Sequence, residues 1–182
     1  WRSVTGGSGW HYDGHTDQWY WATFLPFQPD LNYRHPDVKE TMLSLVRFWL
    51  EKEVDGFRLD IFDALFKDEE FRDNPLSLSF LPSSDGQRLF FQKRTMNLHH
   101  RDTFEFAKEL RAVLNEYGNP PRFLVGEVGG NPETLRSYCG EDSPDGLHSV
   151  FLFQTLNAEL RASAVRGLIR EFETYFPDPF IP

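Results

Sequence analysis

The sequence predicts an α/β fold with parallel strands. Amphipathic helical patterns alternate along the chain with short apolar runs of strand length, in the order helix, strand, helix, strand, helix, strand, helix. Parallel strands need a long crossover, so this alternation indicates a parallel sheet covered by helices. Two layouts remain open at this point, an open doubly wound sheet and a closed (β/α) barrel. No Gly-x-Gly-x-x-Gly motif follows a strand pattern, so the dinucleotide-binding form of the open sheet has no support.

The first 35 residues predict irregular structure, because they are rich in glycine and in turn-forming residues. A helix follows over 36–53, with Pro36 at its first position and Asp37 and Glu40 in its early turns. Its apolar residues recur at spacings of three and four: Val38, Met42, Leu45, Val46, Trp49 and Leu50.

The apolar run 55–61 then predicts a buried strand, and an irregular stretch follows at 66–100. Asp102 and Glu105 are spaced as a capping box, which predicts the start of a second long helix, and Gly118 followed by two prolines ends it. The remaining predicted elements are a strand at 122–127, a short helix at 132–138, a strand at 147–154 and a helix at 157–176.

The composition limits the possible partners. A net charge of −9 over 182 residues argues against nucleic acid and against an anionic membrane. The single cysteine, Cys139, excludes an internal disulfide and a zinc site built from cysteines. The six histidines lack partners at metal-ligand spacing, so we expect no metal and no cofactor. No apolar run is long enough to span a membrane and none resembles a signal sequence, so we expect a cytoplasmic location.

Aromatic residues make up 16% of the chain and gather near its start. Trp10, Tyr12, Trp19, Tyr20 and Trp21 lie close together in the sequence, interrupted by glycine and aspartate. One interpretation is packing within a small, loop-rich subdomain. The other is a wall that faces a sugar, because flat apolar rings stack on the C–H faces of pyranose rings. The composition alone does not choose between them.

Two charged residues interrupt the apolar stretch "GFRLDIFDA". Side chains alternate along a strand, so Arg58 and Asp60 point to one face, and Asp60 and Glu127 each end a predicted strand. If the two strands are neighbours, the carboxylates lie roughly 5 Å apart, which is the spacing in a retaining glycosidase. Arg58 would favour the ionised form of Asp60, while Glu127, expected farther from this cation, would hold a proton. The alternative is a buried ion pair without catalysis.

Three motifs in order resemble the α-amylase superfamily, glycoside hydrolase family 13: "QPDLN" at 28–32, "GFRLD" at 56–60, and "GE" closing a strand at 126–127. Within this family they are similar to the α-glucosidase and oligo-1,6-glucosidase branch. The resemblance implies a fragment of a (β/α)8 TIM barrel, about strands four to six with flanking helices, plus the end of an inserted loop domain. Residues 1–30 would be the C-terminal part of that inserted domain B, and residues 31–182 the partial barrel.

The resemblance also implies roles for individual residues. Asp60 would be the nucleophile and Glu127 the general acid/base. Four further residues would bind substrate or hold the nucleophile: Arg58, Gln28, Phe24 and Ile61. Phe24 and Gln28 match positions that line the pocket for the terminal glucose, and Ile61 matches a position associated with α-1,4 versus α-1,6 preference.

The expected activity is that of a retaining, exo-acting α-glucoside hydrolase that releases glucose from short α-linked glucose oligosaccharides by double displacement. A typical α-amylase carries Lys-His where this chain has Asp63 and Ala64, which favours an exo-acting enzyme. The alternatives are an endo-acting α-amylase, a transglycosylase of the same family, and a non-catalytic barrel that serves as an interaction module. Because the chain contains only three of the eight predicted barrel strands, we expect the 182 residues alone to be inactive.

Overall fold

A parallel sheet forms the centre of the chain, as the sequence predicts. The computed structural model describes residues 1–83 and 86–180 of the chain. Within these ranges the central sheet contains β3 (Gly56–Leu59), β6 (Phe123–Gly126) and β7 (Ser149–Val150), in the order β3-β6-β7. Both pairings are parallel. The predicted α/β fold with parallel strands is therefore confirmed.

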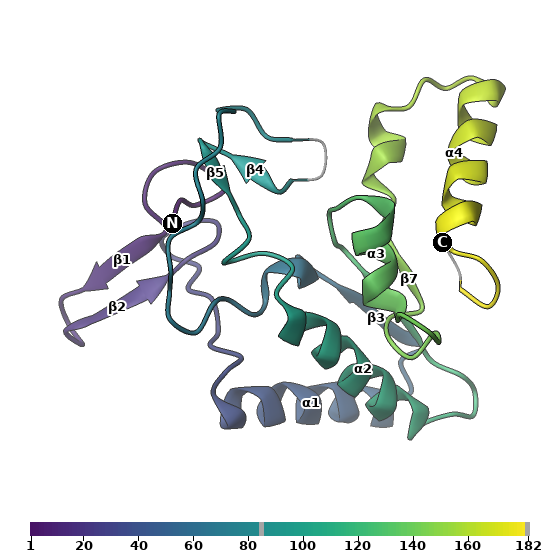
Figure 1. Ribbon diagram of the computed structural model, residues 1–182. Coiled ribbons are helices and arrows are strands. Elements are labelled where there is room, and N and C mark those ends of the chain that lie inside the picture. The colour runs from purple at the N-terminus through teal and green to yellow at the C-terminus, as the bar shows by residue number, and fades with distance from the viewer. Residues whose placement is uncertain (84–85, 181–182) are drawn as a thin grey trace.

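Helices connect and flank these strands (Figure 1). They are α1 (Pro36–Glu51), α2 (Arg101–Asn115), α3 (Pro132–Cys139) and α4 (Ala162–Tyr175). α2 lies in the connection from β3 to β6, and α3 lies in the connection from β6 to β7, so each parallel crossover carries a helix. The predicted helices at 36–53 and 132–138 agree closely with α1 and α3.

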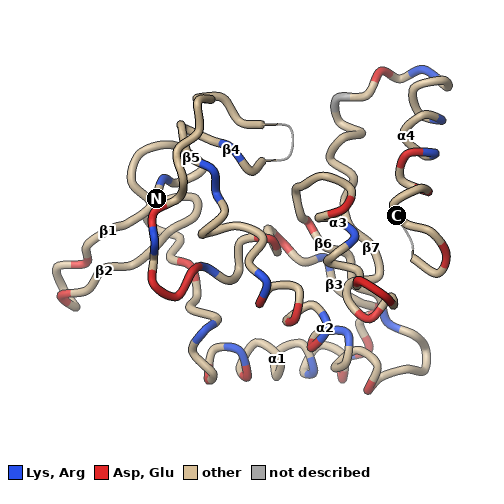
Figure 2. The backbone as a smooth tube through the Cα atoms, viewed as in Figure 1, with Lys and Arg blue, Asp and Glu red and all other residues tan. Residues whose placement is uncertain are grey.

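α1 and α2 lie side by side (Figure 1), and ion pairs join their polar faces. Lys39 Nζ lies 2.8 Å from Glu109 Oε1, and Arg47 Nη2 lies 2.8 Å from Glu116 Oε1. Acidic and basic residues are mixed along both helices rather than gathered in blocks of one sign (Figure 2). Within the described part of the chain, none of the helices has the length and apolarity needed to cross a membrane.

The start of α2 differs from the predicted capping box. The N-cap is His100, whose Nδ1 accepts the backbone N–H of Asp102 at 3.3 Å. The Asp102 carboxylate instead accepts a hydrogen bond from Arg34 Nη1 at 2.7 Å. Because Asp102 still lies in the first turn, its negative charge suits the positive end of the helix dipole. The helix is the one predicted, but a different residue caps it.

The last predicted strand and helix are shorter than expected. Only Ser149–Val150 of the predicted strand 147–154 joins the sheet, because its ladder with β6 ends there and the chain turns into a 3₁₀ helix, η2 (Phe153–Asn157). α4 therefore starts at Ala162 instead of 157, and no side chain caps its first turn.

The N-terminal region contains regular structure that the sequence analysis misses. β1 (Trp10–Asp13) and β2 (Gln18–Trp21) form an antiparallel hairpin in which Trp10 pairs with Trp21. Aromatic residues favour strands, and the Asp13 carboxylate accepts the backbone N–H of Thr16 in the connecting turn. A second short antiparallel pair lies in the stretch predicted to be irregular, formed by β4 (Arg88–Leu89) and β5 (Gln92–Lys93).

A short 3₁₀ helix, η1 (Phe62–Ala64), follows β3 and anchors the strand end in the core. Phe62 is 2% exposed, and its ring centroid lies 6.2 Å from that of Phe106 on α2 and 6.1 Å from that of Tyr138 on α3. Asp63 and Ala64 are also buried. The turn that follows Asp60 is therefore held by packing rather than left as a loose loop.

Candidate active site

Two carboxylates meet at the carboxyl ends of β3 and β6. The strands pair in a register that places Leu59 beside Gly126, so the next residues, Asp60 and Glu127, follow at the same edge of the sheet. The backbone N–H of Glu127 donates to Leu59 O at 2.8 Å, and that of Phe62 donates to Glu127 O at 3.0 Å. The prediction that the two strands are neighbours is confirmed. The carboxyl ends of parallel strands are where α/β proteins place their sites.

Arg58 contacts both carboxylates. One of its terminal nitrogens donates to Asp60 and the other to Glu127. The expectation that Glu127 lies farther from this cation is wrong, because the planar guanidinium presents donors on two sides and spans the gap between the strands. The ion pair is also not deeply buried, since the Arg58 side chain is 48% exposed and that of Asp60 is 69% exposed.

Glu127 lies in a more enclosed position than Asp60, with its side chain 19% exposed. Burial raises the pKa of Glu127, the hydrogen bond with Asp60 raises it further, and the positive charge of Arg58 acts in the opposite direction. The direction agrees with the expectation from the sequence. The leading cause differs, because burial contributes more than the neighbouring charges.

A cavity of about 440 Å³ opens beside Asp60. Its lining includes four of the residues that the sequence analysis selects: Phe24, Gln28, Asp60 and Ile61. The structure thus brings the loop at 23–30 and the turn after β3 to one cavity. Arg58 and Glu127 are not among the lining residues, although both contact Asp60 from the strand side.

A partly buried ion pair that the sequence analysis misses joins the two sides of this cavity. Lys67 Nζ lies 2.5 Å from Asp30 Oδ2, and the two side chains are 12% and 20% exposed. Asp30 also accepts the backbone N–H of Thr23 at 2.9 Å and the Thr23 hydroxyl at 2.6 Å. Burial lowers the pKa of Lys67, and Asp30 opposes this. The pair fixes the segment that carries Phe24 and Gln28 against the segment that follows Asp60.

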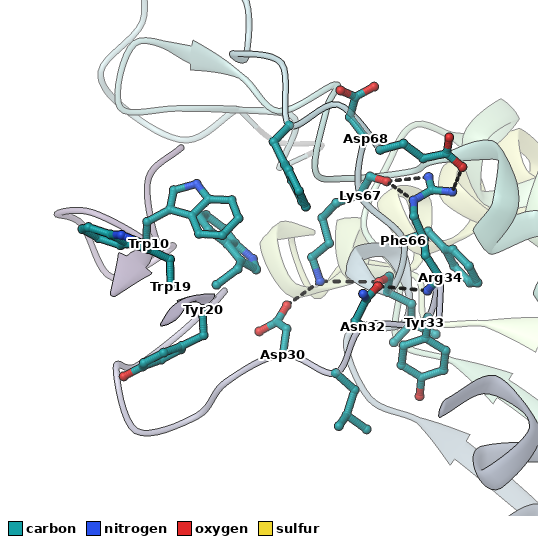
Figure 3. A pocket seen from close by; sticks show the side chains of 15 residues that line it. Trp10, Trp19, Tyr20, Asp30, Asn32, Tyr33, Arg34, Phe66, Lys67 and Asp68 are labelled. Carbon is teal, nitrogen blue, oxygen red and sulfur yellow. Dashed lines mark hydrogen bonds and ion pairs between the residues drawn. The ribbon is translucent and has the colours of Figure 1, made fainter. Parts of the chain in front are cut away.

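A second cavity, of about 380 Å³, lies between the β1–β2 hairpin and residues 65–71 (Figure 3). Its charged groups already have protein partners: Lys67 binds Asp30, and Arg34 donates to Lys67 O at 2.8 Å and to Glu69 Oε1 at 2.7 Å. Because neither Asp60 nor Glu127 lines it, this cavity is not the place where the carboxylates could act.

The aromatic cluster near the N-terminus packs mainly against itself. The ring of Trp1 lies 5.3 Å from that of Trp21, and the ring of Trp10 lies 5.6 Å from Trp21 and 5.3 Å from Phe71, all in edge-to-face geometry. Trp19, by contrast, is 66% exposed. The packing interpretation therefore accounts for Trp10 and Trp21, and the sugar-facing interpretation stays a prediction for Trp19.

Ile61 has an unusual backbone conformation. Its φ and ψ are both 44°, in the left-handed region that β-branched residues rarely adopt. Such a conformation costs on the order of 1–3 kcal/mol and persists only where the surroundings enforce it. Here the buried Phe62 on one side and the β3–β6 pairing on the other enforce it. In this turn the Ile61 backbone N–H donates to the Glu127 carboxylate, while the Ile61 side chain lines the cavity.

Other reactive groups do not form a competing site. In residues 1–83 and 86–180, no group of three or more His, Cys, Asp or Glu side chains could hold a metal ion. Burial raises the pKa of the Cys139 thiol to about 12, so the thiol stays protonated near neutral pH and is a poor nucleophile. The paired carboxylates remain the candidate site.

The family model of the α-amylase catalytic domain matches residues 1–175, so the chain belongs to this family. A "Probable alpha-glucosidase" from Rhizobium meliloti (strain 1021) is 36% identical over 98% of this chain and 33% of its own length. An "Oligo-1,6-glucosidase" from Heyndrickxia coagulans is 31% identical over 92% of this chain and 28% of its own. The chain therefore spans about a third of the length of the curated relatives it matches.

Solved structures agree. The crystal structure of the alpha-glucosyl transfer enzyme XgtA matches with a TM-score of 0.79 and 30% identity, over 96% of this chain and 33% of that one. A trehalose-6-phosphate hydrolase from Bacillus licheniformis matches in fold, with a TM-score of 0.75 and 23% identity over 97% of this chain and 31% of that one. These neighbours are (β/α)8 barrel enzymes of glycoside hydrolase family 13, so the predicted fold class, a part of such a barrel, is confirmed.

Proposed function

We propose that this chain carries the catalytic carboxylates of a retaining α-glucoside hydrolase that releases glucose from short α-linked glucose oligosaccharides. The observation that supports this most is the pair Asp60 and Glu127, which end neighbouring parallel strands and share Arg58. Two carboxyl groups that end neighbouring strands and contact one guanidinium lie close together, which suits a retaining mechanism, whereas an inverting enzyme needs a wider gap to admit water. The relatives named as α-glucosidases support the substrate class.

In the proposed reaction Asp60 acts as nucleophile. Its carboxylate attacks the anomeric carbon of the terminal glucose as Glu127 donates its proton to the glycosidic oxygen, so the leaving sugar departs as an alcohol. This yields an ester between Asp60 and glucose. Glu127, now ionised, removes a proton from water, the water oxygen attacks the same carbon, and Asp60 is released. Two inversions leave the product with the α configuration. Arg58 holds the two carboxylates in position.

The substrate side of the proposal rests on the cavity beside Asp60. We assign Phe24 and Gln28 to the terminal glucose and Ile61 to the leaving sugar, since all three line this cavity. Asp63 is buried and absent from the lining, so it offers no contact to a longer sugar chain, which supports an exo-acting enzyme. We also propose that residues 1–30 are the end of the inserted domain and residues 31–182 a part of the barrel.

Covalent labelling tests this proposal. The intact protein that contains this chain is treated with 5-fluoro-α-glucosyl fluoride, whose electron-poor sugar slows the second step and lets the ester accumulate. We expect the peptide that contains Asp60 to gain the mass of one fluoroglucosyl group, and an Asp60→Asn variant to gain none. An active protein labelled at another carboxylate would contradict the assignment. Absence of both label and activity would favour the interaction-module alternative.

Transglycosylation is a second candidate function, because the matched structure XgtA is described as an alpha-glucosyl transfer enzyme. Both reactions share the glucosyl ester and differ in whether water or another sugar takes the glucose. Product analysis with maltose separates them: hydrolysis gives glucose alone, and transfer also gives trisaccharides. In either case we expect the 182 residues alone to be inactive, because the chain spans only part of the barrel.

A further inference from the structure

Three hydrogen bonds in succession join the turn after β3 to the loop after β6. The N–H of Glu127 donates to Leu59 O at 2.8 Å, and the N–H of Phe62 donates to Glu127 O at 3.0 Å. The third runs from the N–H of Gly129 to the side-chain Oδ2 of Asp63, at 2.9 Å. The first two connect backbone groups and exist for any sequence in this conformation. The third depends on the Asp63 side chain, so a substitution of Asp63 removes it and leaves the first two in place.

Asp63 is an unusual side chain for its surroundings. It is 8% exposed, and burial raises its pKa to about 6. Arg94 and the hydrogen bond from Gly129 oppose this effect, whereas the charge of Glu127 adds to it. Two further groups lie near Asp63. The negative charge of Asp63 helps to raise the pKa of Tyr138, and the backbone N–H of His99 donates to Asp63 O at 2.9 Å. Burying a carboxylate costs free energy. Contact with substrate does not account for this one, because Asp63 does not line the cavity beside Asp60.

We propose that Asp63 is a positioning residue, which holds the loop carrying Glu127 in line with the turn carrying Asp60 by accepting the N–H of Gly129. This inference rests on the proposed function. Asp63 follows Asp60 by one buried turn, and Gly129 follows Glu127 by two residues, so their bond closes a small ring that contains both catalytic carboxylates. If the bond is lost, the loop after β6 moves away from β3 and the Glu127 carboxyl moves with it.

Two substitutions separate the hydrogen bond from the side chain's bulk. Asp63→Asn keeps an oxygen that accepts the Gly129 N–H, and Asp63→Leu keeps the number and branching of the side-chain heavy atoms without any acceptor. In the intact protein we expect Asp63→Leu to lower kcat on maltose about 10- to 100-fold, because small misplacements of catalytic groups are costly. KM should stay within about threefold, since the cavity lining is unchanged. Asp63→Asn should keep kcat within about threefold of the wild type.

The nature of the leaving group reports which carboxylate has moved. An aryl glucoside with a good leaving group needs little help from an acid, so Asp63→Leu should retain more of its activity on 4-nitrophenyl α-glucoside than on maltose. Equal losses on both substrates would overturn the inference that Glu127 is the group held in position. Asp68→Leu is the matched control, because Asp68 is also buried and accepts a backbone N–H, that of Arg72, away from β6.

The outcomes distinguish this inference from the proposed function. If the wild type has no glucosidase activity, the proposed function fails. If the wild type is active and Asp63→Leu matches it in kcat, the proposed function stands and the role of Asp63 is overturned. Should Asp63→Leu not fold, hydrogen exchange in Asp63→Asn and Asp63→Ala provides the measurement. We expect the amide of Gly129 to stay protected in the Asn variant and to exchange faster in the Ala variant, and equal protection in both would also overturn the inference.

Discussion

Asp60 and Glu127 end neighbouring strands and share one arginine, yet their surroundings differ. The Asp60 side chain is 69% exposed and lines the cavity, whereas that of Glu127 is 19% exposed and lies outside the lining. Burial raises the pKa of Glu127. Since Arg58 contacts both groups, the cation cannot be what separates them.

In the mechanism that we propose, burial rather than a charged partner therefore distinguishes the proton donor, Glu127, from the nucleophile, Asp60. A proton donor must hold its proton near neutral pH, which an enclosed carboxyl group does more readily than an exposed one. A nucleophile must reach the substrate, which requires an open face on the cavity. The two neighbouring strand ends supply both environments.

Glu127→Gln in the intact protein is the strongest test of the comparison. It removes the proposed proton donor and leaves the proposed nucleophile, so activity on maltose should fall by about 10²–10⁴-fold. A glucosyl fluoride, whose leaving group needs no proton, should lose much less in its first step. The measurement is kcat/KM on both substrates.

Added azide provides the control for this variant. Azide is a nucleophile that needs no general base, so it should restore turnover of Glu127→Gln on the activated substrate and yield a glucosyl azide. Similar losses on both substrates, together with no response to azide, would show that the two carboxylates do not divide the work as proposed.

Asp63 extends the comparison to a third carboxyl group, which is more deeply buried. Its pKa of about 6 lies above the ordinary value of 3.8, so the folded protein keeps this proton over a pH range in which the unfolded chain has lost it. The contribution to stability is therefore greatest below about pH 4 and is lost as the pH rises to about 6, by roughly 3 kcal/mol in total.

The measurement is the free energy of unfolding against pH for the wild type and Asp63→Asn. We expect the variant to lack this decline and to gain stability relative to the wild type between pH 4 and pH 6. Asp68→Asn serves as a comparison of opposite sign, because the hydrogen bond from Arg72 holds the pKa of Asp68 below its usual range. Parallel curves for the wild type and Asp63→Asn would show that burial does not control this group.

Ile61 is expected to give the smallest effect, on specificity. Threonine is also β-branched, so Ile61→Thr keeps the backbone preference at this left-handed position and changes mainly the surface offered to the leaving sugar. We expect the ratio of kcat/KM for isomaltose to kcat/KM for maltose to fall, by an amount equivalent to about 1–3 kcal/mol. A ratio unchanged within about 0.5 kcal/mol would remove Ile61 from the account of linkage preference.

Much of this site can be predicted from the sequence because its two carboxylate residues come directly after apolar runs of strand length. Asp60 and Glu127 each come directly after a strand pattern, and the register of two parallel strands then brings them together. The second contact of Arg58 cannot be predicted in this way. Alternation shows which face a side chain takes, but not how far a long guanidinium reaches along it.

Features without periodicity are the ones that the sequence does not reveal. Asp30 and Lys67 lie 37 positions apart in irregular segments, so no pattern pairs them. The β1–β2 hairpin is different, since two short runs rich in aromatic residues flank a turn that begins at Gly14, which is a usable strand signal. At 147–154 apolar character predicts a strand, but it does not show where pairing with β6 stops.

The parallel pairing of β3 with β6 also bears on how the site is assembled in time. Arg58 and Glu127 are 69 positions apart in the sequence, with η1, β4, β5 and α2 between them. Helices such as α1 and α2 form from local contacts within microseconds, whereas distant parallel strands must first close a long loop, which makes their pairing slow. A chain leaving the ribosome would therefore contain its helices well before Asp60 and Glu127 came together.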